Sequence, residues 1–258
     1  MVTNLGQWHY VDRHRKLKFF ASQGLTTNGS GSRLYRGEYS IPRSIKRLGW
    51  VHIGDPDFSH GHVFDAYQGA EGARSKMYRV TTPAGEHFEY VHQLEGDEQL
   101  NNSYVAISPD GQWMISGEWG VMTRLLMFPT PILNPATAPM GGTLSLSGMI
   151  TLDHPARNVQ GATFLDATHL LCSTNDADTD LWPTPRQLLQ IDLAGPLTGA
   201  TMTAKVTSLG ELPTESRCSG TFEVEGIDYD PSTGNLRVVI IPPGLCSLLP
   251  VTYTFRRP

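Results

Sequence analysis

The chain has 258 residues, of which 39% are hydrophobic and 17% charged, and its net charge is −5. A chain of this length can bury a substantial core, and at this negative charge nucleic acid is not expected as a partner. No apolar stretch approaches the ~18 residues that a membrane-spanning helix needs, so we expect no membrane partner.

Alternating apolar and polar residues predict short strands along the whole chain. In chain order these segments are 16–21, 62–68, 76–82, 87–93, 113–119, 124–129, 144–150, 188–193, 204–210, 236–241 and 251–256. The 26 glycines and 18 prolines supply turns between them. No amphipathic helical stretch of convincing length is found, so we predict an all-β fold forming a single domain over residues 1–258.

Five stretches of the chain resemble one another. Each begins with a polar residue, continues with small or apolar residues, and reaches a turn of Asp, Asn, Pro or Gly; they span 22–29, 52–61, 103–111, 160–169 and 225–234. Their leading polar residues are Gln23, His52, Ser103, Gln160 and Glu225. A repeated unit of about four strands predicts a β-propeller, in which such units are arranged as blades around a central axis.

The repeats predict five blades, over about 17–48, 49–97, 100–153, 157–213 and from 220 to the C-terminus. In the first blade, the later strands are expected within 32–40 and 41–47. The fifth blade has three clear strands, so we expect QWHYV (7–11) to supply its outer strand and close the ring. Four or six blades, or a β-sandwich with long loops, are the alternatives.

Two inner-strand segments, YVAISPDGQWM (104–114) and EGIDYD (225–230), resemble those of the SMP-30/gluconolactonase-like propellers. That group consists of calcium-dependent six-bladed lactonases with metal ligands at the mouth of the channel. The resemblance implies that Glu225 corresponds to a ligand Glu. Ser103 falls where the group has a ligand Asn, and the predicted blade number differs.

The leading residues of the repeats are expected to face one funnel, because the first strand of each blade lines the central channel. We predict that His52, Asp55 and Glu225 are catalytic, since His titrates near neutral pH and a nearby carboxylate would orient it. Asp55, Glu225 and Asp228 are predicted to bind a divalent cation, with calcium favoured. The alternative is that these residues are polar channel and turn residues with a structural role.

Substrate-binding residues are predicted from two patterns. Gln23 and Gln160 lead two of the repeats, and Glu118, Trp119 and Tyr67 belong to segments that place a carboxylate near an aromatic ring, a combination that suits sugars. A further segment, NDADTD (175–180), spaces three aspartates as at the start of an EF-hand loop, without its glycine or its final glutamate.

The three cysteines indicate the cellular compartment. Cys218 and Cys246 bracket the last strand-rich stretch and are predicted to form a disulfide, while Cys172 is predicted to be a buried thiol. A disulfide favours an extracellular or periplasmic location after removal of a signal peptide. Three free thiols in a reducing compartment are the alternative.

The motifs of serine hydrolases, P-loop proteins, dinucleotide-binding proteins and zincins are absent from the sequence. We predict a monomeric hydrolase or lyase that acts on a small polar or carbohydrate-like substrate at the channel mouth. The alternative is a non-catalytic carbohydrate- or protein-binding propeller. The leading residues differ between repeats, whereas a multivalent lectin usually repeats its binding residues, and this favours a single site.

Overall fold

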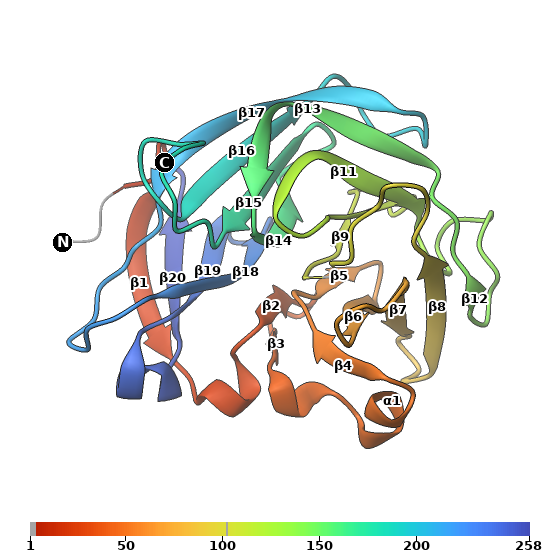
Figure 1. Cartoon of the computed structure of the whole chain (residues 1–258), viewed down its shortest axis with the longest axis horizontal. Coiled ribbons are helices and arrows are strands. Elements are labelled where there is room, and N and C mark those ends of the chain that lie inside the picture. The colour runs from red at the N-terminus through yellow and green to blue at the C-terminus, as the bar shows by residue number, and fades with distance from the viewer. Residues whose placement is uncertain (1–3, 102) are drawn as a thin grey trace.

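The computed structural model describes residues 4–101 and 103–258, and its strands are arranged around a centre (Figure 1). The first two blades contain β2 (Gly24–Thr27) and β3 (Arg33–Arg36), then β4 (Trp50–Ile53), β5 (Asp57–Ser59), β6 (His62–Gly69), β7 (Ser75–Thr81) and β8 (His87–Gln93). The third contains β9 (Ala106–Ile107), β10 (Trp113–Ser116), β11 (Val121–Pro129) and β13 (Gly148–Arg157), and β12 (Gly142–Thr143) pairs with β8.

The last two blades follow the same order. The fourth contains β14 (Val159–Phe164), β15 (His169–Thr174), β16 (Gln187–Leu193) and β17 (Met202–Glu211). The fifth contains β18 (Glu223–Asp230), β19 (Asn235–Ile241), β20 (Val251–Arg256) and β1 (His9–Arg15). Its outermost strand therefore comes from the other end of the chain.

The innermost strands close a ring. They contact one another in the order β18, β2, β5, β9 and β14, and β14 in turn contacts β18. The described part of the chain is therefore a five-bladed β-propeller, as predicted, and the four-bladed, six-bladed and sandwich alternatives are excluded.

The predicted closure of the ring is confirmed. β1 pairs antiparallel with β20, from His9 opposite Arg256 to Arg15 opposite Val251. Trp8 precedes this strand and is 1% exposed, and its ring makes a T-shaped contact with that of Tyr229, with 5.8 Å between the centroids. Hydrophobic burial at Trp8 and the β1–β20 hydrogen bonds thus hold the two ends of the ring together.

The first blade differs from the prediction, because it has two strands rather than four. The predicted strand over 16–21 contains a 3₁₀ turn, η1 (Lys18–Phe20), and the segment 41–47 contains a short helix, α1 (Arg43–Arg47). Pro42 immediately precedes α1, where proline is well tolerated, and Ile45 supplies its buried contact. Two more 3₁₀ turns are η2 (Glu38–Ser40) and η3 (Gly244–Leu248).

The third and fourth blades are also joined at their outer edges. β13 pairs in parallel with β17, from Ile150 opposite Met202 to Leu152 opposite Ala204, so the two blades form one eight-stranded sheet. The sequence pattern had not indicated this pairing, because both strands read as ordinary outer strands.

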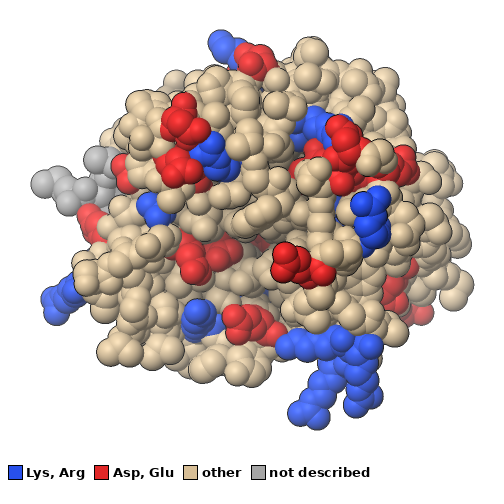
Figure 2. All heavy atoms as spheres, in the orientation of Figure 1, with Lys and Arg blue, Asp and Glu red and all other residues tan. Residues whose placement is uncertain are grey.

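The predicted cysteine pairing is confirmed: Cys218 and Cys246 form a disulfide, and Cys172 is a free, buried thiol. Among residues 4–101 and 103–258, no helix has the length and apolar character needed to cross a bilayer. Figure 2 shows charged side chains in scattered groups on one face, with basic ones at the lower edge, where α1 carries Arg43, Lys46 and Arg47.

Replacement of Trp8 by alanine tests the closure of the ring. We expect Trp8→Ala to lower the free energy of unfolding by about 3–5 kcal/mol, because a large, fully buried ring is removed. Trp119→Ala is the control, since Trp119 is 52% exposed. Guanidinium chloride unfolding followed by circular dichroism measures both; equal midpoints for the two variants would contradict the expectation.

Candidate functional site

Asp55 lies at the centre of the ring and is fully buried. The backbone N–H of Leu25 in the first blade donates to its Oδ1 at 3.0 Å, and that of Ile227 in the fifth blade donates to its Oδ2 at 2.9 Å. The Asp55 backbone also donates to the carbonyl of Ser103 and accepts from Val105, both leading into the third blade. A single residue of the second blade therefore holds three other blades.

Three glycines make room for this carboxylate. Gly24, Gly161 and Gly226 belong to the first, fourth and fifth blades, and a Cβ atom on any of them would collide with Asp55. The centre of the ring is therefore filled by Asp55 at this level. The side chain of Asp55, which the sequence predicts to be catalytic and to bind metal, is enclosed, and both of its oxygens accept backbone N–H groups.

Other inner-strand side chains join neighbouring blades in the same way. The backbone N–H of Ile107 in β9 donates to Asp57 Oδ2 at 2.6 Å, which links the second and third blades. The N–H of Tyr229 in β18 donates to Thr163 Oγ1 at 3.2 Å, which links the fourth and fifth. Side chains at these repeat positions therefore accept backbone N–H groups of the next blade, which have no strand partner there because the inner strands are not joined in one sheet.

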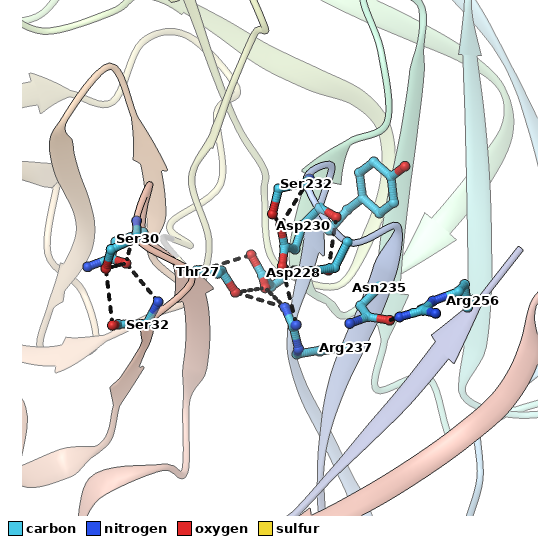
Figure 3. A network of polar contacts seen from close by, with 12 residues as sticks. Thr27, Ser30, Ser32, Asp228, Asp230, Ser232, Asn235, Arg237 and Arg256 are labelled. Carbon is cyan, nitrogen blue, oxygen red and sulfur yellow. Dashed lines mark hydrogen bonds and ion pairs between the residues drawn. The ribbon is translucent and has the colours of Figure 1, made fainter.

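Asp228 links the fifth blade to the first (Figure 3). Its Oδ1 accepts the backbone N–H of Thr27 at 3.1 Å, and its Oδ2 accepts the Thr27 hydroxyl at 2.6 Å and an Arg237 N–H at 3.0 Å. The same guanidinium lies 3.4 Å from Asp230 Oδ2. Both oxygens of Asp228, a predicted metal ligand, thus already have protein partners.

The leading residues of the five repeats line one pocket. This pocket, which we call the ring pocket, has a volume of about 680 Å³. Each blade contributes one leading residue to its lining: Gln23, His52, Ser103, Gln160 and Glu225. Residues up to 202 positions apart are therefore brought to one cavity by the radial arrangement. Trp119 also lines the pocket and is half exposed.

Glu225 and His52 have shifted protonation equilibria in this pocket. Burial, helped by the charge of Glu223 and opposed by that of Lys18, raises the pKa of Glu225 well above its ordinary value. Burial lowers the pKa of His52 below 6.5, and the charge of Glu38 opposes this shift. The pocket therefore favours a protonated carboxyl and an uncharged imidazole, which are a proton donor and a proton acceptor.

Two predicted substrate-binding residues do not line the ring pocket. Glu118 is buried, accepts the Gln99 backbone N–H at 2.8 Å and pairs with Arg124 at 2.6 Å. Tyr67 is 2% exposed and packs in a core cluster with Ile53. Trp119 does line the pocket, whereas its neighbour Glu118 does not.

The sequence reasoning missed the pocket's second set of polar residues: Gln68, Glu71, Gln99 and Asn101. Gln68 lies on β6, the second strand of its blade, and the others lie in connections between strands. With Gln23 and Gln160, the lining holds five carboxamide side chains. Gln99 and Asn101 precede the repeat start at Ser103, whereas no local pattern marks Gln68 or Glu71, which only the fold brings to the pocket.

No group of three or more His, Cys, Asp or Glu side chains is placed to hold a metal ion in the part of the chain described. In the predicted metal-binding set, both oxygens of Asp55 accept backbone N–H groups, and Asp228 accepts hydrogen bonds from Thr27 and Arg237. In the segment 175–180, the three aspartates form ion pairs with the guanidinium of Arg157.

No protein-family model and no curated protein sequence matches the chain. Among solved structures, native arabinanase Arb43A of Bacillus subtilis aligns over 98% of this chain and 94% of its own, at 10% identity and a TM-score of 0.45. The RRP9 WD40 repeats align over 87% of this chain and 57% of their own, at 8% identity and a TM-score of 0.40.

A humanized mutant of Polycomb Repressive Complex 2 from Chaetomium thermophilum aligns over 80% of this chain and 72% of its own, at 8% identity and a TM-score of 0.32. The chain thus spans little more than half of the WD40 protein. No conclusion about function follows from likenesses at these scores.

Replacement of Asp55 by asparagine tests the central contact. The amide nitrogen of asparagine would face a backbone N–H, so one buried donor loses its acceptor, and we expect a loss of about 1–3 kcal/mol in the free energy of unfolding. Asp97→Asn is the matched control, because that side chain is 86% exposed. Urea unfolding measures both variants, and an unchanged midpoint for Asp55→Asn would overturn the structural role.

The pH dependence of stability provides a second test. Burial raises the pKa of Asp57 from 3.8 to about 7, and burial also raises the pKa of Asp55, Glu225 and Asp228. The folded state therefore binds protons that the unfolded state releases, so the contribution of these groups to stability increases as the pH falls from about 7 to 4.

Glu98 acts in the opposite direction. Burial alone would raise the pKa of Glu98, but hydrogen bonds and charges of His92 and Lys76 outweigh it and lower the pKa from 4.5 to about 2. The contribution of Glu98 to folding stability is therefore lost as the pH falls below 4.5. We expect the highest Tm at a pH of about 4–5. Calorimetry between pH 3 and 8 measures this; a Tm that falls steadily from pH 8 to pH 5 would contradict it.

Proposed function

We propose that the ring pocket binds a neutral, hydroxyl-rich molecule such as a sugar, and that the protein is a hydrolase of such substrates. One observation carries this proposal: a leading side chain from every blade lines the same pocket, and among them are a carboxyl group that favours its proton and an uncharged imidazole.

The lining indicates the class of ligand. Carboxamides both donate and accept hydrogen bonds, which suits hydroxyl groups, and the exposed face of Trp119 suits the C–H face of a sugar ring. Among the described residues, the lining contains no Lys or Arg. A lyase that removes a proton beside a substrate carboxylate would need a countercharge there, so hydrolysis is the favoured reaction.

The protonation states that the pocket favours for Glu225 and His52 suit hydrolysis. Glu225 would give its proton to the leaving oxygen as the bond to that oxygen breaks. His52 would accept a proton from a water molecule as the oxygen of that water bonds to the substrate carbon that the leaving group departs from. Product release returns the enzyme to its starting state once the two groups exchange a proton with solvent. We assign no catalytic step to Asp55, whose oxygens accept backbone amides.

The second candidate is a non-catalytic carbohydrate-binding propeller, since the fold hosts enzymes and binding proteins alike. One observation favours it. Of the three acids predicted for the centre, Asp55 and Asp228 bind groups of neighbouring blades, and Glu225 alone of the three lines the pocket, so the pocket lacks the second predicted carboxylate.

Calcium dependence and lactone hydrolysis, which the SMP-30-like segments imply, stay predictions. The ring has five blades rather than that group's six, but Glu225 and Ser103 both line the pocket, so lactones belong among the substrates to be tested. An extracellular or periplasmic location is also proposed, and the Cys218–Cys246 disulfide supports it.

A pH profile distinguishes the proposed acid from an ordinary pocket residue. Turnover of neutral aryl glycosides and of lactones is measured for the wild type, Glu225→Gln and the control Glu223→Gln. We expect Glu225→Gln to lower kcat/KM by about 100-fold or more. Glu223 is exposed on the same strand and its charge raises the pKa of Glu225. Its replacement should therefore retain activity and move the alkaline limb of the profile to lower pH.

The outcomes separate the two candidate functions. Turnover that is equal in Glu225→Gln and wild type would overturn the assigned acid. Sugar binding without turnover, with affinity lost in Trp119→Ala, would establish the binding protein. Absence of both activities would reject the proposal that the pocket accepts hydroxyl-rich ligands.

A further inference from the structure

A second pocket lies at the edge of the fifth blade and shares no lining residue with the ring pocket. We call it the arginine pocket; its volume is about 600 Å³. Arg13 and Arg15 reach it from β1, and Glu215, Ser216 and Arg217 come from the connection between β17 and β18. In Figure 1 these two segments lie beside each other at the left.

The charges in this pocket are unbalanced. Three guanidinium groups face one carboxylate, in a protein whose net charge is −5. Glu215 pairs with Arg13 at 3.0 Å. Arg15 and Arg217 have no hydrogen bond or ion pair to another side chain in the part of the chain described. Two positive groups are thus left to attract an anion.

Two donors of the pocket, Arg13 and Ser216, are held in place by other groups of the protein. The Tyr253 hydroxyl and Glu215 both bind Arg13 and raise its pKa. Ser216 Oγ accepts the backbone N–H of Cys218 at 3.0 Å, which leaves its hydroxyl hydrogen to donate into the pocket. These contacts restrict the geometry that the donors can adopt before any ligand arrives.

The walls of the pocket are joined covalently. Cys218 follows Arg217 in the β17–β18 connection, and its disulfide partner Cys246 lines the pocket from η3. The two walls therefore cannot separate while the disulfide is intact, so the entropy that ligand binding would otherwise cost is reduced.

We propose that the arginine pocket binds a tetrahedral oxyanion, a phosphate or sulfate group. Guanidinium forks and a hydroxyl donor approaching from two segments match oxygens that point in several directions. The group can belong to a free or sugar-linked ester or to a lipid headgroup. The site is independent of the ring pocket and of the hydrolase activity proposed for it.

Titration calorimetry with inorganic phosphate and inorganic sulfate tests this site in the intact, oxidised protein. We expect saturable one-to-one binding that weakens as sodium chloride is raised. Arg15→Gln and Arg217→Gln should each weaken binding by tenfold or more. Arg43→Gln on α1 is the matched control and should bind as the wild type does.

Circular dichroism establishes that the variants are folded, and Glu225→Gln separates the two proposals because it should retain anion binding.

Co-sedimentation with phosphatidylglycerol or phosphatidylcholine vesicles distinguishes the source of the anion. Selective sedimentation with the anionic vesicles identifies a lipid headgroup, and absence of sedimentation identifies a soluble ester. Absence of phosphate and sulfate binding by the wild type at millimolar concentration, or an equal loss in Arg43→Gln, would overturn the proposal.

Discussion

The buried carboxylate of Asp55 is the contact on which the ring depends. It accepts backbone N–H groups from the first and fifth blades, while its own backbone bonds the third. Because inner strands of neighbouring blades are not joined by a continuous sheet, their polar groups need partners of this kind. The crowded centre in turn requires glycine at 24, 161 and 226, so one acid explains three glycines on three other blades.

This arrangement separates structural acids from the candidate catalytic one. Asp55 and Asp228 are buried and Asp57 is partly buried, and each accepts a backbone N–H group from a neighbouring blade. Glu225 is equally buried, yet its side chain lines the ring pocket. Burial raises the pKa of all four carboxyl groups, so a shifted pKa alone does not identify a functional acid here. The groups that each carboxylate oxygen contacts distinguish the structural acids from the functional one.

The fifth blade connects the two pockets with the closure of the ring. Its inner strand supplies Glu225 to the ring pocket, and its outer strand, which comes from the N-terminus, supplies Arg13 and Arg15 to the arginine pocket. One pocket is rich in carboxamides and has no Lys or Arg in its described lining, whereas the other has three guanidinium groups. The two therefore suit ligands of different charge, and neither depends on residues of the other.

The sequence alone determined the repeated strands, the blade number, the pairing of the chain ends, the disulfide, and the five leading residues that meet in the ring pocket, because these follow from local patterns repeated at intervals. Tertiary structure decided what each polar residue does. Asp55 and Asp228 stand at corresponding places in their repeats, but they bind different groups, and the partners Leu25 and Ile227 lie 30 and 172 residues from Asp55. The helix in the first blade and the inward burial of Glu118 and Tyr67 were likewise set by contacts between distant segments, which no local pattern encodes.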